Sequence, residues 1–417
     1  MNIYLVGGAV RDRLLDFPVL ERDWLVVGAT SEMMLAQGYR PVGKDFPVFL
    51  HPQTHEEYAL ARTERKTAPG YKGFSVDANP AVSIKEDLMR RDLTINAIAI
   101  DEHGVLIDPF GGQQDLQQRL LRHVSPAFNE DPVRILRVAR FAARYAHLGF
   151  TVAEETRLLM QDMVSSGEAD HLVADRVWAE LYKALSETTP AAFFETLKSC
   201  GALAVIFPEI QALFGVPQPP QYHPEIDTGV HSLMALTQAV KLSEKPEVRL
   251  AALLHDLGKA LTKPEHWPSH HGHERKGLPV LETFCRRLRV PKAVKTLCAQ
   301  VMEYHTHSHR AFELRADTLI DMLQTIGAFK AENHLDDFLL ACEADARGRT
   351  GFEARDYPQA DFIRAAAQTA LAVDTRQALQ ADLKGPQIGA AIQTLRSQAV
   401  NTFKQQFQSM SSVSHSS

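Results

Sequence analysis

The 417-residue sequence has few cysteines, little net charge and no long apolar run. Its four cysteines are scattered without a CxxC pair, which argues against a thiolate zinc site or a disulfide framework and is typical of a reducing cytosol. No uninterrupted apolar stretch reaches about 18 residues, and no basic leader precedes one at the N-terminus, so we expect a cytoplasmic protein without a membrane partner. A formal net charge of −6 argues against a generally basic nucleic-acid coat protein but leaves room for a local basic face.

The length predicts several domains, and the pattern of apolar residues changes near residue 125. Before it, short apolar runs alternate with turn signals, which predicts a small α/β domain. After it, nearly every segment has helical periodicity, and the proline-rich segment 215–229 is interpreted as a linker. The expected divisions are an α/β head (1–124), a helical neck (125–214), an all-α domain (228–329), a helical C-terminal region (330–405) and a disordered tail (406–417).

The N-terminal segment GGAVRD joins a predicted strand to a predicted helix. Such a turn presents backbone N–H groups and a helix N-terminus, which suit a triphosphate, and Arg11 lies within reach of the same phosphates. Glu21 and Asp23 follow; in a strand they project from one face, and a cation such as Mg²⁺ would relieve their repulsion. Either motif alone also fits a glycine turn followed by two solvated acids.

A row of arginines runs along the predicted helix PVRILRVARFAARY. Because like charges at this spacing repel, we expect an anionic ligand, such as a triphosphate or a tRNA phosphate, to relieve the repulsion. The alternative is a solvated arginine face that covers the core. The row consists of Arg134, Arg137, Arg140 and Arg144.

Histidines gather in the second half of the chain around RLAALLHDLGKAL, which places His255 next to Asp256. Another histidine lies upstream, and the histidine-rich segments HHGHE and EYHTHSH follow downstream. Imidazole and carboxylate ligands from separate helices suit a transition metal such as Ni²⁺, Mn²⁺ or Co²⁺. The expected ligands are His231, His255 and Asp256, with His273 and His305 as further candidates.

Taken in order, these motifs resemble the class II tRNA nucleotidyltransferases and the bacterial poly(A) polymerases. GGAVRD followed by two carboxylates is similar to their nucleotidyltransferase head, and EDPVRILRVARFAARY to the helix that reads the incoming base. RRDLTINAIAI (90–100) and DPFGG (108–112) are similar to two further blocks of the head. HDLGKALT and ADARGRTGFE extend the resemblance to the bacterial multifunctional CCA-adding enzymes, which carry an HD phosphohydrolase domain. Glu21 is a departure, because the family's metal pair is usually Asp-x-Asp.

For the first half of the chain, the resemblance implies a head domain with a polymerase-β-like mixed sheet. The implied activity is the addition of C, C and A to a tRNA 3′ end from CTP and ATP, without a nucleic-acid template. Glu21 and Asp23 would be the catalytic carboxylates that hold Mg²⁺, and Asp92 would brace the arginines. Glu57 would be either a third acid beside the metal or a solvated strand acid, and the second interpretation is favoured. Asp131 and Arg134 would choose the base, because a carboxylate beside a guanidinium matches the hydrogen-bonding edges of C and A. The resemblance assigns nucleotide binding to Gly8, Arg11, Arg91, Asp131, Arg134, Arg137 and Arg140.

For the HD domain, the resemblance implies 2′,3′-cyclic phosphodiesterase, 2′-nucleotidase and phosphatase activity with a transition metal, Ni²⁺ by preference. His255 and Asp256 would be catalytic, Lys259 would hold a phosphate, and the metal ligands would include His305. The expected partners are the tRNA 3′ end, CTP and ATP, with monomer and homodimer both open. Alternatives are a poly(A) polymerase, a CC-only or A-only enzyme, a phosphohydrolase whose head only binds nucleotide, and a tRNA-binding scaffold.

Overall fold

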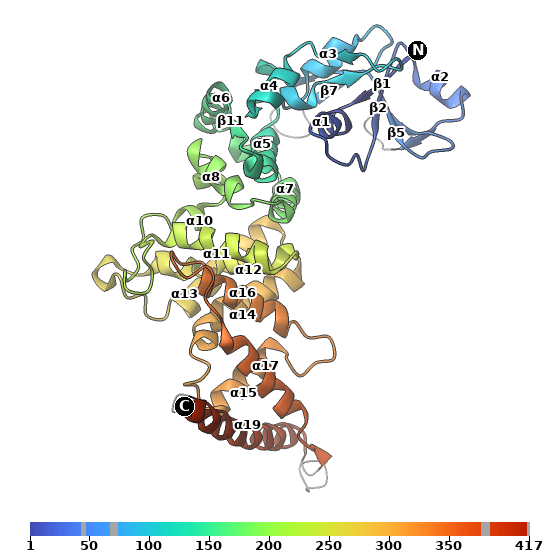
Figure 1. Cartoon of the computed structure of the whole chain (residues 1–417). Helices are drawn as coiled ribbons and strands as arrows, with labels where there is room; N and C mark the ends of the chain where they lie inside the picture. The colour runs from blue at the N-terminus through green and yellow to red at the C-terminus, as the bar shows by residue number, and fades with distance from the viewer. Residues whose placement is uncertain (43–46, 67–73, 377–383, 415–417) are drawn as a thin grey trace. The chain divides into compact units, whose positions relative to one another are not determined.

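A computed structural model describes residues 1–42, 47–66, 74–376 and 384–414. It divides into two compact units, Met1–Pro208 and Glu209–Ser417, and each is described by itself (Figure 1). Within the described ranges, every named strand lies in the first unit, and the second unit is helical. This arrangement confirms the predicted fold class, an α/β head followed by helical regions.

A seven-stranded mixed sheet forms the centre of the head. Its order is β3-β4-β5-β2-β1-β8-β9, with β2 parallel to β5 and antiparallel to β1. Both faces of β2 are covered, because Leu25 belongs to one apolar cluster and Val26 to another. The strands are β1 Asn2–Val6, β2 Asp23–Val27, β3 Arg40–Val42, β4 Val48–Leu50, β5 Glu57–Leu60, β8 Ala99–Ile100 and β9 Leu106–Ile107. Separate two-stranded pairs are β6 Thr63–Lys66 with β7 Phe74–Asp77, and β10 Leu120–Leu121 with β11 Thr151–Val152.

The DPFGG segment of the head begins a helix. The Asp108 carboxylate accepts the backbone N–H groups of Gly112 at 2.7 Å and Gln113 at 2.8 Å. A Cβ added at Gly112 would collide with the carbonyl oxygen of Thr94, so this position requires glycine. This block is therefore a structural turn that positions the helix. The helices of the head are α1 Gly8–Leu14, α2 Ser31–Ala36, α3 Ile84–Met89 and α4 Gly112–Gln118.

Helix α5 (Val133–Tyr145) is central to the neck. It packs against α7 (Ala174–Ser186) and α8 (Ala191–Ser199). Its buried side chains include Leu136 and Val138, which are two residues apart and therefore point to different sides, so α5 is covered on more than one side. The other neck helices are α6 Glu154–Ser165 and α9 Ala202–Ile206, and α10 Pro208–Gln211 leads into the second unit.

In the second unit, α11, α12, α14 and α16 pack against one another, and α13 packs on α14. Alanine and leucine dominate the buried side chains of α12, which allows close approach of its neighbours. No helix within the described ranges is both long and apolar enough to cross a membrane. The helices are α11 Thr228–Leu242, α12 Pro246–Leu254, α13 His273–Leu288, α14 Lys292–His309, α15 Ala316–Ile326, α16 Leu335–Arg347, α17 Pro358–Leu371 and α19 Pro386–Ser414.

The C-terminal segment differs from the predicted disordered tail at 406–417. Helix α19 continues to Ser414, and residues 415–417 lie outside the described part of the chain. The physical reason is an aromatic cluster: Phe407 stacks on Phe312 with ring centroids 5.8 Å apart. Burial of this ring extends the helix into a serine-rich end whose composition gives no helical signal.

Candidate active sites

The two carboxylates of the first motif lie at the start of β2. The strand begins at Asp23, so Glu21 lies just before it rather than inside it as predicted. The parallel register places Glu57 of β5 directly beside Asp23. Desolvation raises the pKa of Asp23; the nearby Arg91 opposes the rise, and Glu21 adds to it. All three carboxylates are exposed to solvent, and carboxylates at the start of two adjacent strands suit a hard divalent cation such as Mg²⁺.

Arg91 connects the glycine turn to these carboxylates. Gly7 has a φ of 70°, and a Cβ added there would lie 2.9 Å from Arg91 Nη1, so the turn needs glycine to leave room for the guanidinium. Arg91 donates to the Asp87 carboxylate and to the Asn96 carbonyl, both at 3.3 Å. This cation is therefore held beside the GG turn and within electrostatic reach of Asp23.

Arg11 is buried inside the protein rather than presented to solvent. Its guanidinium donates to Asn96 Oδ1 at 2.6 Å and to the carboxylate of Asp12 at 2.8 Å. It also lies 5.3 Å from the ring centroid of Phe141 and 5.4 Å from that of Tyr145. Through these contacts Arg11 connects α1 with α5, next to the glycine turn.

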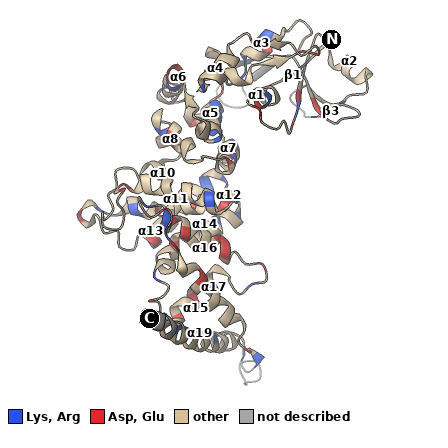
Figure 2. Cartoon of the chain, in the orientation of Figure 1, with Lys and Arg blue, Asp and Glu red and all other residues tan. Residues whose placement is uncertain are grey.

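Three of the four arginines of α5, coloured blue in Figure 2, form ion pairs with acids from other elements of the first unit, and Arg134 donates to backbone carbonyls. Their spacing therefore does not by itself require an anionic ligand, and nucleotide binding by these residues stays a prediction. The bracing role predicted for Asp92 is confirmed. The ion pairs are Arg137–Asp92 at 2.7 Å, Arg140–Glu180 at 2.7 Å and Arg144–Asp12 at 3.3 Å.

Asp131 and Arg134, the residues expected to read the base, are each engaged by the protein. The Asp131 carboxylate accepts two hydrogen bonds from Arg176, at 3.1 and 2.9 Å. The Arg134 guanidinium donates to the carbonyl oxygens of Ala127, at 2.5 Å, and Arg90, at 2.6 Å. A carboxylate–guanidinium pair is thus present, but with Arg176 of α7, which no sequence motif indicated.

In the second unit, six side chains form what we call the HD cluster: His231, His255, Asp256, His273, His305 and Asp345. Asp345 comes from α16, so the cluster extends past residue 329, the expected end of the domain. His231 Nε2 lies 3.0 Å from Asp345 Oδ1, and His255 Nε2 lies 3.0 Å from Asp256 Oδ2. Asp345 was missed as a ligand, although its segment ADARGR is one of the blocks that resemble the family.

The remaining histidines face the other oxygen of Asp256. His273 Nε2 lies 3.2 Å and His305 Nε2 3.7 Å from Asp256 Oδ1. The two imidazole nitrogens are 3.3 Å apart. The structure therefore brings all the predicted HD ligands together, and sets of three of them lie close enough to hold a metal ion.

The outer ring nitrogens orient the imidazoles of the cluster. His255 Nδ1 lies 2.7 Å from the Ala252 carbonyl, and His273 Nδ1 lies 2.9 Å from the His270 carbonyl. His305 Nδ1 lies 3.1 Å from the Val301 carbonyl. Since a carbonyl only accepts, each Nδ1 carries a proton, and each Nε2 faces the cluster. This is the arrangement that metal-binding histidines use. Burial would lower the pKa of His255, but the neighbouring Asp256 and Asp345 outweigh it and raise that pKa.

The segment 215–229 is an ordered part of this site rather than only a linker. It supplies Glu225, whose carboxylate lies 3.1 Å from His231 Nδ1. Asp227 caps α11 by accepting the Val230 N–H at 2.9 Å. On the opposite side of the cluster, His309 Nε2 lies 2.6 Å from Asp345 Oδ2. Glu225 and His309 orient the inner residues, and neither was predicted.

The acids of the cluster are held ionised. Burial alone would raise the pKa of Asp256, but His255 and Lys259 outweigh it, and the pKa lies well below its ordinary value. Burial likewise opposes ionisation of Asp345, and His255 with His309 lowers its pKa in the same way. Burial lowers the pKa of His305 well below its usual range, which leaves that ring neutral.

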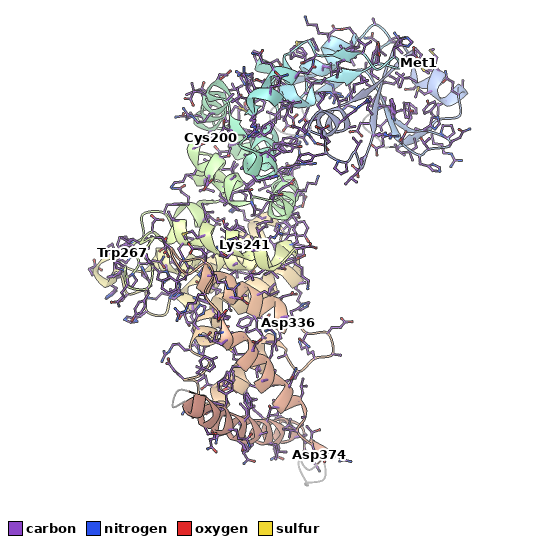
Figure 3. The ribbon with its side chains drawn as sticks, viewed as in Figure 1. Met1, Cys200, Lys241, Trp267, Asp336 and Asp374 are labelled. Carbon is purple, nitrogen blue, oxygen red and sulfur yellow. The ribbon has the colours of Figure 1, made fainter. Side chains whose placement is uncertain are left out.

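Lys259 lies beside the cluster. Its ammonium is 2.6 Å from Asp256 Oδ2 and 2.5 Å from Gln218 Oε1. The loop that follows it is fixed by Trp267, labelled in Figure 3, which donates to the Thr262 hydroxyl at 3.1 Å. That hydroxyl in turn lies 2.6 Å from His270 Nδ1. These bonds hold the loop that leads into α13 and His273.

Family models match three parts of the chain. The poly A polymerase head domain matches residues 3–122, and the HD domain matches residues 228–344. A probable RNA- and SrmB-binding site of polymerase A matches residues 149–214. Head, neck and HD cluster therefore each have a counterpart in a known domain.

Two curated relatives match nearly the whole length. The chain is 62% identical over 404 residues to the Multifunctional CCA protein of Thioalkalivibrio sulfidiphilus, covering 97% of this chain and 99% of that protein. It is also 62% identical over 405 residues to the Multifunctional CCA protein of Methylococcus capsulatus, covering 97% and 95%. The chain belongs to the multifunctional CCA protein family. Membership confirms the function predicted from the motifs, a CCA-adding nucleotidyltransferase joined to an HD phosphohydrolase domain.

Solved structures agree on the fold of the family. The CCA-adding enzyme of Bacillus stearothermophilus in complex with CTP matches with a TM-score of 0.65 at 24% identity, over 96% of this chain and 89% of that one. The Thermotoga maritima CCA-adding enzyme complexed with tRNA matches with a TM-score of 0.61 at 20% identity, over 96% and 87%.

Proposed function

We propose that the first unit adds CCA to the 3′ end of tRNA from CTP and ATP, choosing the nucleotides without a nucleic-acid template. The observation that carries this proposal is the meeting of Asp23, Glu57 and Arg91 beside the Gly7–Gly8 turn, where a triphosphate and its cation would be bound together. Glu21 and Asp23 are the proposed Mg²⁺ ligands. When bound, Mg²⁺ would lower the pKa of the attacking 3′-hydroxyl and neutralise charge on the leaving pyrophosphate.

The residues of the chain bind and orient the nucleotide. Gly8 opens α1 and leaves its backbone N–H free for phosphate, and Arg91 lies beside it. Arg11, Arg137 and Arg140 are proposed to bind the nucleotide by exchanging their present acidic partners for phosphate oxygens. Each exchange would leave the acidic partner without its arginine, so the contacts of the bound nucleotide must offset the cost of that buried carboxylate.

Base choice is proposed to require a similar exchange at the start of α5. Asp131 would release Arg176, and Arg134 would release its carbonyl partners, so that both present their edges to the base. A carboxylate and a guanidinium together match C and A, whereas U and G would leave buried groups unpaired at about 1–3 kcal/mol each.

For the second unit, we propose a metal-dependent phosphohydrolase acting as 2′,3′-cyclic phosphodiesterase, 2′-nucleotidase and phosphatase. Both oxygens of Asp256 and His255 Nε2 are buried. The Lys259 ammonium lies 2.6 Å from Asp256 Oδ2, and the imidazole nitrogens gathered around both oxygens fit a cation as well. The proposed ligands are His231, His255, Asp256, His305 and, in addition, Asp345. Ni²⁺ is the proposed metal because imidazole nitrogen dominates the donor set. All four cysteines are buried free thiols, which fits the cytoplasm proposed as the location.

The deciding experiment incubates the protein with a tRNA that ends at the discriminator base, with each nucleoside triphosphate alone and then with CTP and ATP together. We expect two C residues from CTP alone, and a complete CCA end only when both nucleotides are present. A long A tract from ATP alone would instead identify a poly(A) polymerase. Termination at CC with both nucleotides present would identify a CC-only enzyme.

A further inference from the structure

We propose that Gln218, Lys259 and Arg349 form a pocket beside the HD cluster that holds the non-bridging oxygens of the phosphate group to be hydrolysed. We call these three residues the phosphate pocket. The inference rests on the phosphohydrolase function proposed above. It adds Gln218 and Arg349, which have no assigned role, to Lys259, for which phosphate binding was expected.

The side-chain amide of Gln218 is buried, at 1% exposure, and only one of its two polar atoms has a partner. Oε1 lies 2.5 Å from the Lys259 ammonium, and because an ammonium only donates, this contact identifies which amide atom is the oxygen. The Nε2 atom carries two N–H donors, and it is buried without a hydrogen-bond partner among the residues that the structure describes. A buried donor without an acceptor is unfavourable, so this atom calls for an acceptor that arrives with a ligand.

The backbone around Gln218 fixes the position of the amide. The Gln218 N–H donates to the Ile226 carbonyl at 2.7 Å, and the Pro217 carbonyl lies 2.8 Å from His270 Nε2. Ile226 has a φ of 61°, which a β-branched residue rarely adopts. Strain of this kind persists where surrounding contacts require it, and it clusters at ligand-binding sites. The turn therefore holds the amide against Lys259 instead of letting it swing into solvent.

Lys259 gives the pocket its charge and connects it with the HD cluster. Its ammonium lies 2.6 Å from Asp256 Oδ2, so a phosphate held by Lys259 would adjoin the proposed metal ligand. The contacts with Asp256 and Gln218 use two of the three N–H donors, and the third can be directed at a phosphate oxygen. Because Lys259 is buried, its attraction for an anion is screened less than that of a surface lysine.

Arg349, just after α16, supplies the third donor group. Its Nη2 lies 3.7 Å from Asp345 Oδ1, too far for a hydrogen bond, and its buried Nε has no hydrogen-bond partner in the described part of the chain. Burial lowers the pKa of His223 to about 4, and both Lys259 and Arg349 contribute to the lowering. The two cations therefore lie within electrostatic reach of the same imidazole, whose ring centroid is 4.7 Å from that of His231 in the cluster.

These three donor groups match a phosphate better than a neutral ligand. An amide N–H₂, an ammonium and a guanidinium offer only donors at the free positions, and the non-bridging oxygens of a phosphate offer only acceptors. The competing explanation is an ordered water that accepts from Gln218 Nε2 and leaves the phosphate to other groups. The two explanations differ in the phosphate affinity that remains when Nε2 alone is replaced.

The test uses inorganic phosphate and the Co²⁺-loaded full chain, with Asp23→Asn as a background that removes the head carboxylate site. Phosphate affinity is read from the paramagnetic broadening of the ³¹P resonance, which reports only phosphate close to the bound ion, and cobalt content is measured in parallel. Gln218→Glu keeps an oxygen for Lys259 and removes the Nε2 donor. We expect about tenfold weaker phosphate binding at unchanged cobalt content. Gln221→Glu, at an exposed glutamine three residues away, adds the same charge and should bind phosphate like the background. Unchanged affinity in Gln218→Glu, or an equal loss in Gln221→Glu, overturns the proposal.

Arg349→Gln repeats the test from a different segment of the chain. We again expect about tenfold weaker phosphate binding, whereas Arg355→Gln, at an exposed arginine six residues further on, should leave the affinity unchanged. Background affinity in Arg349→Gln would overturn the three-residue pocket. The broadening does not depend on turnover. A chain that binds phosphate through these residues but hydrolyses no 2′,3′-cyclic phosphate would refute the proposed function and leave the pocket standing, and a chain that hydrolyses it with full phosphate affinity in Gln218→Glu would do the reverse.

Discussion

The two candidate sites neutralise their charged side chains in opposite ways. In the first unit, the arginines assigned to the nucleotide already have partners in the protein, as Arg11 does in Asp12 of the same helix and Arg137 in Asp92 of another segment. In the HD cluster, His255 Nε2 and both oxygens of Asp256 are buried among imidazoles, and Lys259 supplies an ammonium 2.6 Å from Asp256 Oδ2. The arginines of the nucleotide site have protein partners before its ligand binds, whereas the donor atoms of the HD cluster are arranged to receive a cation.

This difference shows how each site gains from its ligand. A nucleotide must displace protein partners, so its binding free energy is the difference between the bonds that it forms and the bonds that it breaks. A wrong base forms fewer bonds and is therefore rejected easily. A cation in the HD cluster is bound by donor atoms that the fold has already gathered, so binding it stabilises the folded state directly. We therefore expect substitutions in the first unit to change catalysis and selectivity, and substitutions in the cluster to change metal content as well.

The largest expected effect separates the two sites completely. Asp23→Asn should lower CMP incorporation by roughly 10³-fold or more, because it removes a metal ligand, while hydrolysis of a 2′,3′-cyclic phosphate stays unchanged. His255→Ala should have the reverse effect. Both reactions are measured on one preparation, with Asp162→Asn, at an exposed carboxylate on α6, as a control that alters neither. Loss of both activities in either variant would contradict two independent sites.

The second prediction tests how much the pairing of Asp92 with Arg137 contributes to stability in the nucleotide site. Burial alone would raise the pKa of Asp92, but Arg137 and Asn96 outweigh it and lower the pKa to about 2. A carboxylate whose folded pKa is lowered stabilises the fold above its ordinary pKa and loses that contribution as pH falls toward the folded value. Asp92→Asn should therefore cost about 2 kcal/mol at pH 7, the equivalent of the shift.

The measurement is urea-induced unfolding followed by tryptophan fluorescence. In a Trp267→Phe background the two remaining tryptophans, Trp24 and Trp178, report on the first unit. The loss caused by Asp92→Asn should be equal at pH 7 and pH 5, because both lie above the ordinary carboxyl pKa of about 4. A loss that changes between these two pH values would show that another group supplies it.

The third prediction concerns the room that Gly7 leaves for Arg91. Gly7→Ala and Gly38→Ala both place a Cβ at positive φ, 70° and 82°, and each should cost about 1 kcal/mol in stability. Only the added Cβ at position 7 meets Arg91, since nothing lies within 4 Å of the one at position 38. Gly7→Ala should therefore also weaken CTP binding roughly tenfold, the equivalent of about 1.4 kcal/mol. Equal CTP affinity in the two variants would show that Arg91 does not take part in nucleotide binding.

The smallest expected effect tests Glu57 as the third acid beside Asp23. Glu57→Gln should raise the Mg²⁺ concentration needed for half-maximal CMP incorporation by roughly tenfold or less, because one nearby charge is lost and the predicted ligands stay. Glu32→Gln, at an exposed acid on α2, is the control. An unchanged Mg²⁺ requirement would assign Glu57 to the solvated strand surface, the other interpretation of this residue.

Sequence motifs predicted the parts of both sites whose members are close along the chain. Glu21 with Asp23 and His255 with Asp256 stand in recognisable blocks, although Glu21 lies just before β2 and α12 ends at Leu254. Asp345 was missed as a ligand because it lies 114 residues from its partner His231, and only the packing of α16 against α11 brings them together.

The arginines of α5 show the opposite error. Their spacing correctly predicted a helix, but the argument that they await an anion considered only residues on the same helix. Arg140, for example, is neutralised by Glu180, which lies 40 residues further along the chain on α7. Spacing along a helix describes repulsion within it and says nothing of the acids that other helices bring.

By itself, the sequence determined the family and the fold class, because these depend on local periodicity and on short blocks in a recognisable order. Only the tertiary structure decided which charges are paired and which are left for a ligand. Ion pairs and metal sites depend on distances between atoms of a few ångströms, and these distances are set by the packing of helices and strands that are remote in the sequence. For that reason the paired arginines of the nucleotide site and the gathered donor atoms of the HD cluster became distinguishable only in three dimensions.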